Sequence, residues 1–256
     1  MSSSTLRLFS SSDYADDGKS RDVLIIGDSV ELLKSKVGEV LGVLAIASTN
    51  LELVTKACDR LVPGLDNGDS ISLCVGSNET VRKVTLGVLS TACSRHNSPA
   101  RPHALSALVG NNKSAIVVIV PAVRDHVWAQ VSAVSRQYHT FILQRSKKNT
   151  QTPLNVNVEK TTDVVVVFPT PKNTGENAEN AELLQRLAYI ADNIQFCQHL
   201  VDMPTNFLNA STYVDECQKV HDRLLATKHV TDAGECRIEI IREDLEVSIG
   251  IKLFNR

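Results

Sequence analysis

Short apolar runs that alternate with helix-like patterns limit the possible folds of this chain more than any other feature. Five runs are rich in β-branched residues and bounded by Gly, Pro, Ser or Asn: 23–26, 43–47, 71–75, 116–120 and 164–168. Continuous apolar runs of this length are typical of strands that are buried on both faces, as in a mainly parallel sheet. The runs therefore predict strands at the centre of a layered domain.

Segments with helical spacing lie between these runs, at about 50–61, 100–109 and 123–138. In the last of them Val123, Val127, Val131 and Val134 are spaced to form one buried stripe. Strands that alternate with helices predict the α/β class, here a mixed, mainly parallel sheet sandwiched by helices.

The pattern changes after a polar break at 170–180. A helical stripe follows, made of Leu183, Leu187, Ile190, Ile194, Cys197 and Val201. Pro204 is expected to end this helix, because proline has no amide donor and clashes with the preceding turn. Asn209 or Ser211 can cap a second helix that runs to about Ala226. Residues 236–241 are predicted as a strand, and a new element is expected from Arg242.

These changes divide the chain into four predicted parts. They are a flexible, Ser-rich tail (1–20), an α/β domain (21–170), a linker with connecting helices (171–227) and the truncated start of a second α/β domain (228–256).

The composition of the chain limits the classes of partner that it can bind and the cellular compartment expected for it. The chain has 27 basic and 29 acidic side chains, so it lacks the positive field of a nucleic-acid or anionic-membrane binder. No apolar run reaches the roughly 18–20 residues of a membrane helix, and the N-terminus lacks the apolar core of a secretory signal. The six cysteines are scattered, which favours reduced thiols. We expect a cytoplasmic protein.

One local motif suggests a serine nucleophile. Residues 25–29, Ile-Ile-Gly-Asp-Ser, resemble the nucleophile block of the GDS-type esterases, and 110–112, Gly-Asn-Asn, could mimic their oxyanion-hole asparagine. A serine needs a histidine base, and the Asp-x-x-His block that supplies it in that family does not occur here. We favour a structural role, with Ser29 as a helix cap and the Gly-Asn pair as a turn.

The sequence contains no recognisable metal or phosphate site. The seven histidines are dispersed (His96, His103, His126, His139, His199, His221 and His229), without His-Glu-x-x-His or Cys-x-x-Cys spacing. The glycines form no phosphate-binding loop, and the basic residues Arg145, Lys147 and Lys148 are expected in a solvated loop.

Two stretches resemble the leucine aminopeptidase family (M17), in its animal branch of probable aminopeptidase-like proteins. Residues 91–99, Thr-Ala-Cys-Ser-Arg-His-Asn-Ser-Pro, resemble a segment of the family's N-terminal domain. Residues 198–209, Gln-His-Leu-Val-Asp-Met-Pro-Thr-Asn-Phe-Leu-Asn, followed by Tyr-Val-Asp-Glu at 213–216, are similar to the stretch that joins its two domains. There a helix ends in an Asp-x-Pro-x-Asn turn and a second helix follows.

The resemblance implies a macro-domain-like α/β domain in front of a cytosolic metalloexopeptidase that removes N-terminal residues from peptides, usually as a hexamer. Two divalent cations, zinc or manganese, would activate a water and stabilise the developing oxyanion. The family binds them through an Asp-Ser-Gly-Gly block and an Asn-Thr-Asp-Ala-Glu-Gly-Arg block in its C-terminal domain. Neither block occurs in this sequence, and 247–256 do not resemble the family's continuation.

No catalytic or metal-binding residue can therefore be carried over, and substrate contacts stay unknown. We expect this chain to bind no metal and to be inactive alone. We expect turn-forming roles for His96 and Asn97, with Ser98 or Asn97 capping the next helix, and for Asp202, Pro204 and Asn206. A non-catalytic α/β module that binds a ligand or regulates an oligomer stays open as the alternative.

Overall fold

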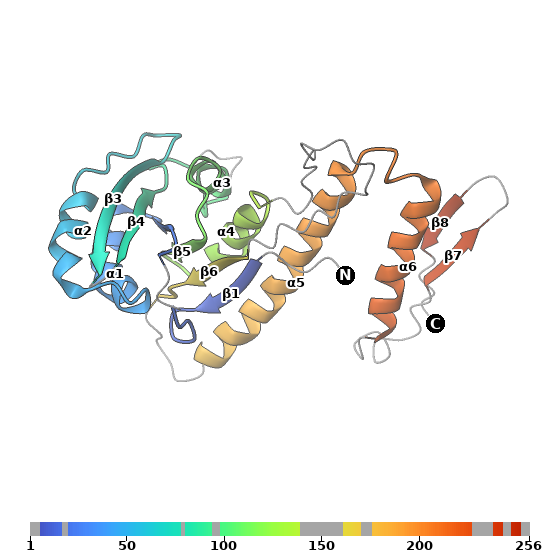
Figure 1. The fold of residues 1–256 in the computed structure, drawn as a ribbon, viewed down its shortest axis with the longest axis horizontal. Coiled ribbons are helices and arrows are strands. Elements are labelled where there is room, and N and C mark those ends of the chain that lie inside the picture. The colour runs from blue at the N-terminus through green and yellow to red at the C-terminus, as the bar shows by residue number, and fades with distance from the viewer. Residues whose placement is uncertain are drawn as a thin grey trace. The chain divides into compact units, whose positions relative to one another are not determined.

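The structure is a computed structural model that describes residues 6–16, 20–77, 80–93, 98–138, 161–169, 176–226, 238–242 and 247–251 (Figure 1). The chain divides into two compact units, Met1–His199 and Leu200–Arg256.

A six-stranded sheet with the order β1-β6-β5-β2-β4-β3 forms the centre of the first unit. Its strands are β1 (Leu6–Ser10), β2 (Val23–Gly27), β3 (Asp69–Ser77), β4 (Thr80–Val88), β5 (Ile116–Val120) and β6 (Thr162–Val166). All neighbours pair in parallel except β3, which runs antiparallel to β4. The predicted mixed, mainly parallel sheet is confirmed.

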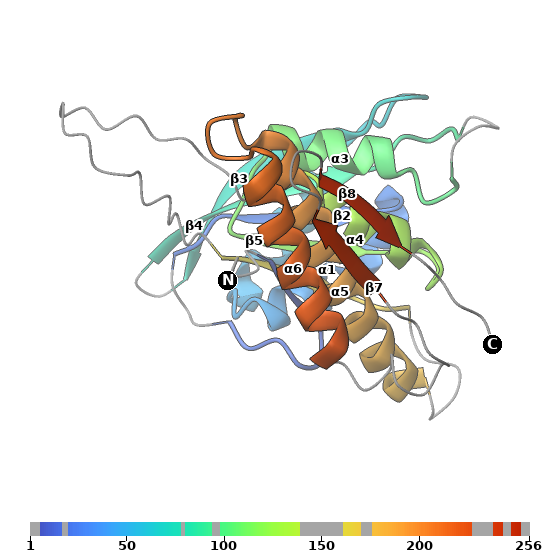
Figure 2. The ribbon, with the colours of Figure 1, turned by 90° about the vertical axis from the view of Figure 1, so that its right-hand side faces the viewer.

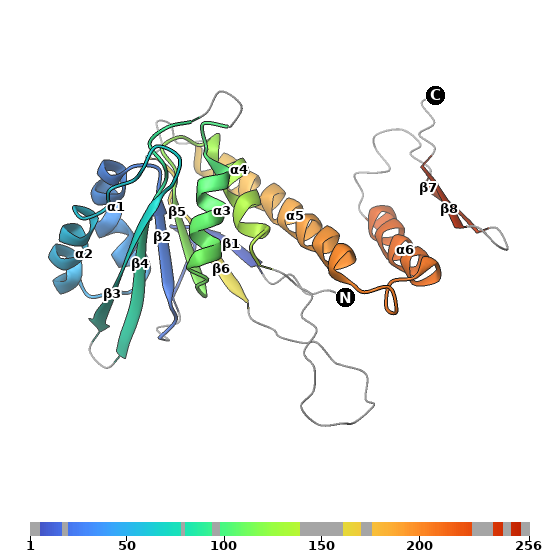
Figure 3. The same cartoon turned by 90° about the horizontal axis from the view of Figure 1, so that it is seen from above.

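Helices cover both faces of this sheet (Figure 3). α1 (Val30–Val43) and α2 (Leu51–Cys58), which follows the short 3₁₀ helix η1 (Ser48–Asn50), pack on one face. α3 (Pro102–Asn111), α4 (His126–Ser135) and α5 (Glu176–Asp202) pack on the other. The three helices predicted within 50–138 and the helix that ends before Pro204 are all present.

The apolar runs of β2, β5 and β6 are continuous because each of these strands has a core on both sides. In β2, Val23 and Ile25 point into the core under α1 and α2, whereas Leu24 and Ile26 point into the core under α3, α4 and α5. β5 and β6 divide their side chains in the same way. Alternate residues of a strand face opposite sides, so polar positions would be costly on either face.

The run at 71–75 differs from the prediction, because β3 is an edge strand that exposes Ser72 and Cys74.

The second unit contains α6 (Ala210–Ala226) and an antiparallel pair, β7 (Ile238–Arg242) and β8 (Val247–Ile251). Figure 2 shows the two strands beside α6, which contacts both. Asn209 caps α6 as predicted, because its Oδ1 accepts a hydrogen bond of 3.1 Å from the backbone N–H of Thr212.

The prediction of a strand at 43–47 is wrong. Val43 is the last residue of α1, and Leu44 N–H still donates to Val40 O as in a helix. Ala45 then adopts a left-handed conformation with φ 51°, which ends the helix. The run is apolar because Leu44 and Ile46, which follow the last turn of α1, are buried in the core on that face of the sheet. A buried helix end and a short buried strand have the same composition.

The flexible tail predicted over 1–20 is wrong for Leu6–Ser10. These residues form β1, an edge strand that pairs with β6, and Leu6 and Tyr14 are buried. The sequence of β1, Leu-Arg-Leu-Phe-Ser, is too short and too polar to be distinguished from a tail. Nor did the periodicity of the sequence predict α1 or β4.

The described helices include none that combines the length and the apolar character needed to cross a membrane.

Candidate functional site

The carboxyl ends of β2 and β5 lie side by side in the sheet. From β2 the chain turns to α1 on one face, and from β5 it turns to α4 on the other. Open α/β proteins commonly bind ligands at such a reversal, and this position at the carboxyl ends of β2 and β5 is called the crevice below.

Asp28 occupies this crevice directly after β2 and is 3% exposed. Its Oδ2 accepts a hydrogen bond of 2.8 Å from Ala122 N–H and lies 2.7 Å from His126 Nδ1. Its Oδ1 accepts one of 2.6 Å from Gln130 Nε2. One buried carboxylate thus ties the end of β2 to the first turns of α4.

Arg101 closes the same crevice from the start of α3. Its guanidinium donates to the carbonyl oxygens of Asp28, at 3.0 Å, and of Ser90. The backbone of Arg101 is left-handed, with φ 49°, which is a costly conformation for a non-glycine residue. Protein groups therefore fill the position that a ligand would take.

An aspartate–histidine pair is half of a proton-relay system, and a nucleophile would complete it. Within the described part of the chain, no serine or cysteine is hydrogen-bonded to His126. The geometry therefore supports a role in holding loops. His126 is thus a histidine held by a hydrogen bond to Asp28.

Ser29 is a helix cap, as predicted. Its Oγ accepts a hydrogen bond of 3.2 Å from Leu32 N–H at the start of α1. Gly27 permits this tight turn, because a Cβ there would lie 2.9 Å from Leu33 Cβ. The Gly110–Asn112 motif is also structural, since Asn112 ends α3 and its Nδ2 donates to Leu108 O at 3.0 Å. These contacts give the esterase hypothesis no support.

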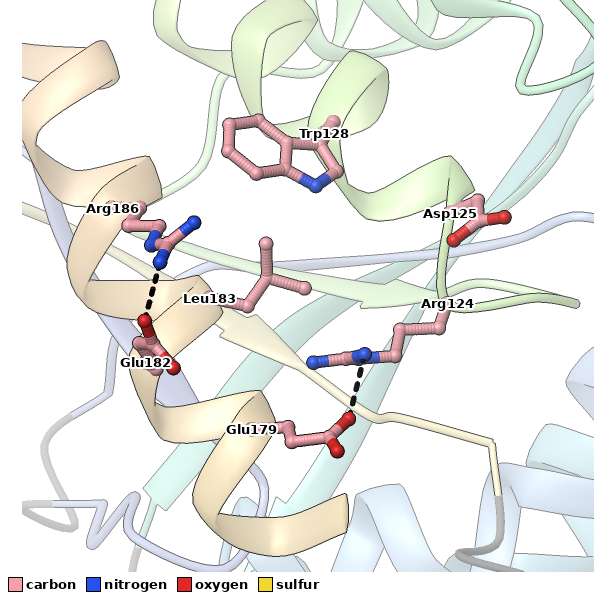
Figure 4. A pocket seen from close by; sticks show the side chains of 7 residues that line it. All are labelled: Arg124, Asp125, Trp128, Glu179, Glu182, Leu183 and Arg186. Atoms are coloured by element: carbon pink, nitrogen blue, oxygen red, sulfur yellow. Dashed lines mark hydrogen bonds and ion pairs between the residues drawn. The ribbon is translucent and has the colours of Figure 1, made fainter.

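A pocket of about 430 Å³ opens next to the crevice, between α4 and α5 (Figure 4). Charged side chains surround an apolar centre, and the lining residues are Arg124, Asp125, Trp128, Glu179, Glu182, Leu183 and Arg186. Arg124 pairs with Glu179 at 3.0 Å, and Arg186 pairs with Glu182 at 2.5 Å. Sequence reasoning missed this pocket, because it depends on how α5 packs beside α4.

A buried ionic cluster lies near the opposite ends of the strands. Asp163 is 1% exposed and accepts hydrogen bonds from Arg7 and Arg21, both at 2.7 Å, and from the Tyr14 hydroxyl at 3.3 Å. Burial, and then the Asp163 charge, raise the pKa of Tyr14 to about 12. The contacts are typical of a structural ion network that joins β1, β6 and the chain before β2.

The described residues do not fit a two-cation site. They contain no group of three or more His, Cys, Asp or Glu side chains placed to hold a metal ion. His103 is exposed on α3, and His221 lies 3.2 Å from Asp222 on α6. His199 is half-buried near the end of α5. His96, His139 and His229 lie outside the described residues, as do Asn97 and the basic residues Arg145, Lys147 and Lys148.

The segment that follows α5 is a turn, as predicted, and backbone hydrogen bonds to Pro204 close it. The carbonyl of Pro204 accepts from the N–H groups of Phe207, at 2.8 Å, and Leu208, at 3.0 Å. The side chain of Asn206 is exposed and makes no hydrogen bond to the backbone of the described turn.

The prediction that Ser98 caps α3 is wrong, and Asn97 lies outside the described residues. Ser98 Oγ accepts from Ala100 N–H at 3.3 Å, but this bond lies in the turn before the helix. The helix begins at Pro102 with Arg101 at its N-cap and no side-chain cap.

Comparisons of the chain with protein families, curated proteins and solved structures all find aminopeptidases. A family model described as M17 aminopeptidase N-terminal domain 2 matches residues 21–150. Two curated proteins, each called probable aminopeptidase NPEPL1, come from Pongo abelii and Homo sapiens. Both are 28% identical over 214 residues, a stretch that covers 81% of this chain and 37% of each relative. The chain thus spans little more than a third of the length of these relatives.

A leucyl aminopeptidase from Leishmania major, solved in complex with actinonin, has a similar structure. The TM-score is 0.59 at 20% identity, over 83% of this chain and 38% of the other. At that identity the likeness concerns the fold alone.

Proposed function

This chain belongs to the M17 aminopeptidase family, and from that membership we propose that it is the N-terminal part of a metal-dependent enzyme that removes amino-terminal residues from peptides. The observation that carries the proposal is the family match over 21–150, which contains four of the six sheet strands. The aminopeptidase relatives named above support the same activity for the whole protein.

The proposed activity depends on zinc or manganese, and the described residues offer no donor set for either ion. We therefore assign this chain no catalytic step. Its proposed contribution is a folded scaffold, with the two core clusters and the joint after α5 that would connect to a catalytic domain.

The test is activity and metal content of the purified chain. We expect no hydrolysis of leucyl-p-nitroanilide with Mn²⁺ or Zn²⁺, and no tightly held metal by elemental analysis. Metal-dependent turnover by this chain alone would contradict the scaffold role. Sequencing the longest transcript of the gene tests the enzyme itself, because it should encode the two metal-ligand blocks.

A second candidate is a non-catalytic module that joins an aminopeptidase oligomer. The observation that favours it is a core completed within the first unit, since Leu183, Leu187 and Ala191 of α5 are buried there. Co-expression with a complete M17 enzyme separates the two proposals. A module of this kind would co-purify with the enzyme at fixed stoichiometry, whereas a transcript with both ligand blocks would favour the first candidate.

We also propose that the whole protein is a homo-oligomer, a hexamer in the manner of its family, and cytosolic. The exposed thiols of Cys74 and Cys197, neither in a disulfide, suit a reducing compartment. Light scattering of the whole protein and fractionation of cells test the two statements separately.

A further inference from the structure

We propose that the free edge of β3 pairs with the β3 strand of a second copy of this chain, so that two sheets join across a two-fold axis. The proposal rests on the geometry of this edge and is independent of the proposed enzyme activity. β3 is the outermost strand on one side of the sheet, beside β4 (Figure 3). It has nine residues, whereas a typical strand has about 5–6.

Two side-chain contacts show which backbone groups of β3 point away from β4. Asn50 Nδ2 donates to the carbonyl oxygen of Gly76 at 2.9 Å, and the N–H of Ser70 donates to Asp69 Oδ1 at 2.8 Å. In an antiparallel pair, every second residue of a strand directs both of its backbone groups to the same side. The alternate residues from Ser70 to Gly76 therefore direct their N–H and C=O groups outward.

The residues between these two ends are Ser72 and Cys74, and both are exposed. Within the described part of the chain, their outward N–H and C=O groups make no hydrogen bond. Proteins usually protect such an edge with a charged side chain, a proline or a bulge. β3 has none of these after Asp69, because 70–77 is Ser-Ile-Ser-Leu-Cys-Val-Gly-Ser and its register with β4 is unbroken. The edge is thus open to pairing.

The sequence of β3 favours a second copy as the partner strand. An antiparallel pair centred on Leu73 places Ser72 of each copy opposite Cys74 of the other, so that each outward N–H meets a C=O. On the core face, Leu73 then lies beside its own counterpart and Ile71 lies beside Val75. Apolar side chains meet apolar ones on one face, and small uncharged side chains meet on the other.

The apolar positions also supply a reason for the two copies to associate. Ile71 and Leu73 are only half-buried against the core under α1 and α2. A second β3 strand at the edge would cover the part of these side chains that still contacts water, which is favourable. Backbone hydrogen bonds supply affinity in such an added strand, and matching side chains supply the choice of partner.

Sedimentation of the purified chain under reducing conditions tests the association. We expect a dimer at chain concentrations of about 100 μM, the range of a weak interface. Cys74→Pro removes an N–H group that points away from β4, so the fold should survive, as circular dichroism would show. Its dissociation constant should rise at least about ten-fold, because each copy loses a hydrogen bond. Cys74→Ser keeps the backbone groups and should dimerise like the unaltered chain.

Cross-linking tests the register. In Ser72→Cys, the introduced thiol lies opposite Cys74 of the second copy, and the Cα separation of about 5.5 Å in such a pair permits a disulfide. Mild oxidation should therefore give a covalent dimer on a non-reducing gel. Gly76→Cys is the matched control on the same strand and face, where a Cβ meets nothing within 4 Å. Its thiol would lie four positions along the strand from the residue opposite Cys74, at roughly 13 Å, so it should add no covalent dimer.

The proposal is overturned if the chain sediments as a monomer up to about 100 μM. It is equally overturned if Cys74→Pro associates as tightly as Cys74→Ser, or if Gly76→Cys cross-links as readily as Ser72→Cys. An oligomer of the whole protein that forms without this contact would support the assembly proposed above and still overturn the pairing of β3.

Discussion

Asp28 holds three donors on one buried carboxylate, so its replacement by asparagine is the sharpest test of the crevice. The amide that replaces the carboxylate offers one acceptor oxygen and directs an N–H₂ group at a donor from Ala122, His126 or Gln130. We expect Asp28→Asn to lower the free energy of unfolding by about 3 kcal/mol in urea titrations.

The matched control is Asp59→Asn. Asp59 pairs with Lys34 on an exposed surface, and such pairs contribute little. Equal losses in the two variants would show that Asp28 does not tie β2 to α4.

Cys58 gives a second prediction at this scale. Burial, and then the Asp59 charge, raise the pKa of its thiol to about 11. At pH 8 only about one molecule in a thousand then carries the reactive thiolate. Iodoacetamide should therefore modify the exposed Cys74 first, and Cys58 only in denaturant, as read by peptide mass spectrometry.

The raised pKa of Cys58 also makes the stability of the fold depend on pH. The folded state holds the Cys58 proton more tightly than the unfolded state, so its contribution to stability is present below pH 9 and falls as the pH rises toward 11. Modification of Cys58 as fast as Cys74 in the folded protein would contradict both statements.

At the scale of elements, substitutions at the cap of α1 distinguish between Ser29 as a helix cap and Ser29 as a nucleophile. Ser29→Ala removes the acceptor for Leu32 N–H and should lower the free energy of unfolding by about 1 kcal/mol, whereas Ser29→Asp should retain most of it. Ser35→Ala, in the same helix, is the control, because Ser35 Oγ bonds only Leu32 O and alanine is the better helix former.

Hydrolysis of a p-nitrophenyl ester, measured on the same variants, tests the alternative. We expect none in the unaltered chain. An activity that disappears in Ser29→Ala would restore Ser29 as a nucleophile.

Local signals predicted the caps and the central strands, because both depend on residues close in sequence. Ser29 and Asn209 each bond an N–H group three residues ahead. β2 and β5 are buried at every position. The crevice and the pocket could not be predicted in this way. Asp28 finds Gln130, 102 positions away, and Arg124 finds Glu179, 55 positions away, only after the helices have packed.

At the scale of the whole molecule, packing decides which helices belong to the sheet. The sequence predicts a boundary at 170, which assigns α5 to a linker. The structure buries Leu183, Leu184, Leu187 and Ala191 of α5 in the same core as α3 and α4. The long helix thus completes the sandwich, and the contacts of the first unit extend to His199.

Two truncations test this arrangement. The fragment 1–199 retains both core clusters and should unfold cooperatively at a temperature close to that of the full chain. The fragment 1–170 loses the buried residues of α5, each leucine worth about 1.5–3 kcal/mol of burial, which together approach the whole stability of a typical domain. The 1–170 fragment should therefore bind a hydrophobic dye, and its circular dichroism should show no sharp melting transition. A cooperative 1–170 fragment with a native melting temperature would show instead that α5 is a linker, as the sequence boundary predicts.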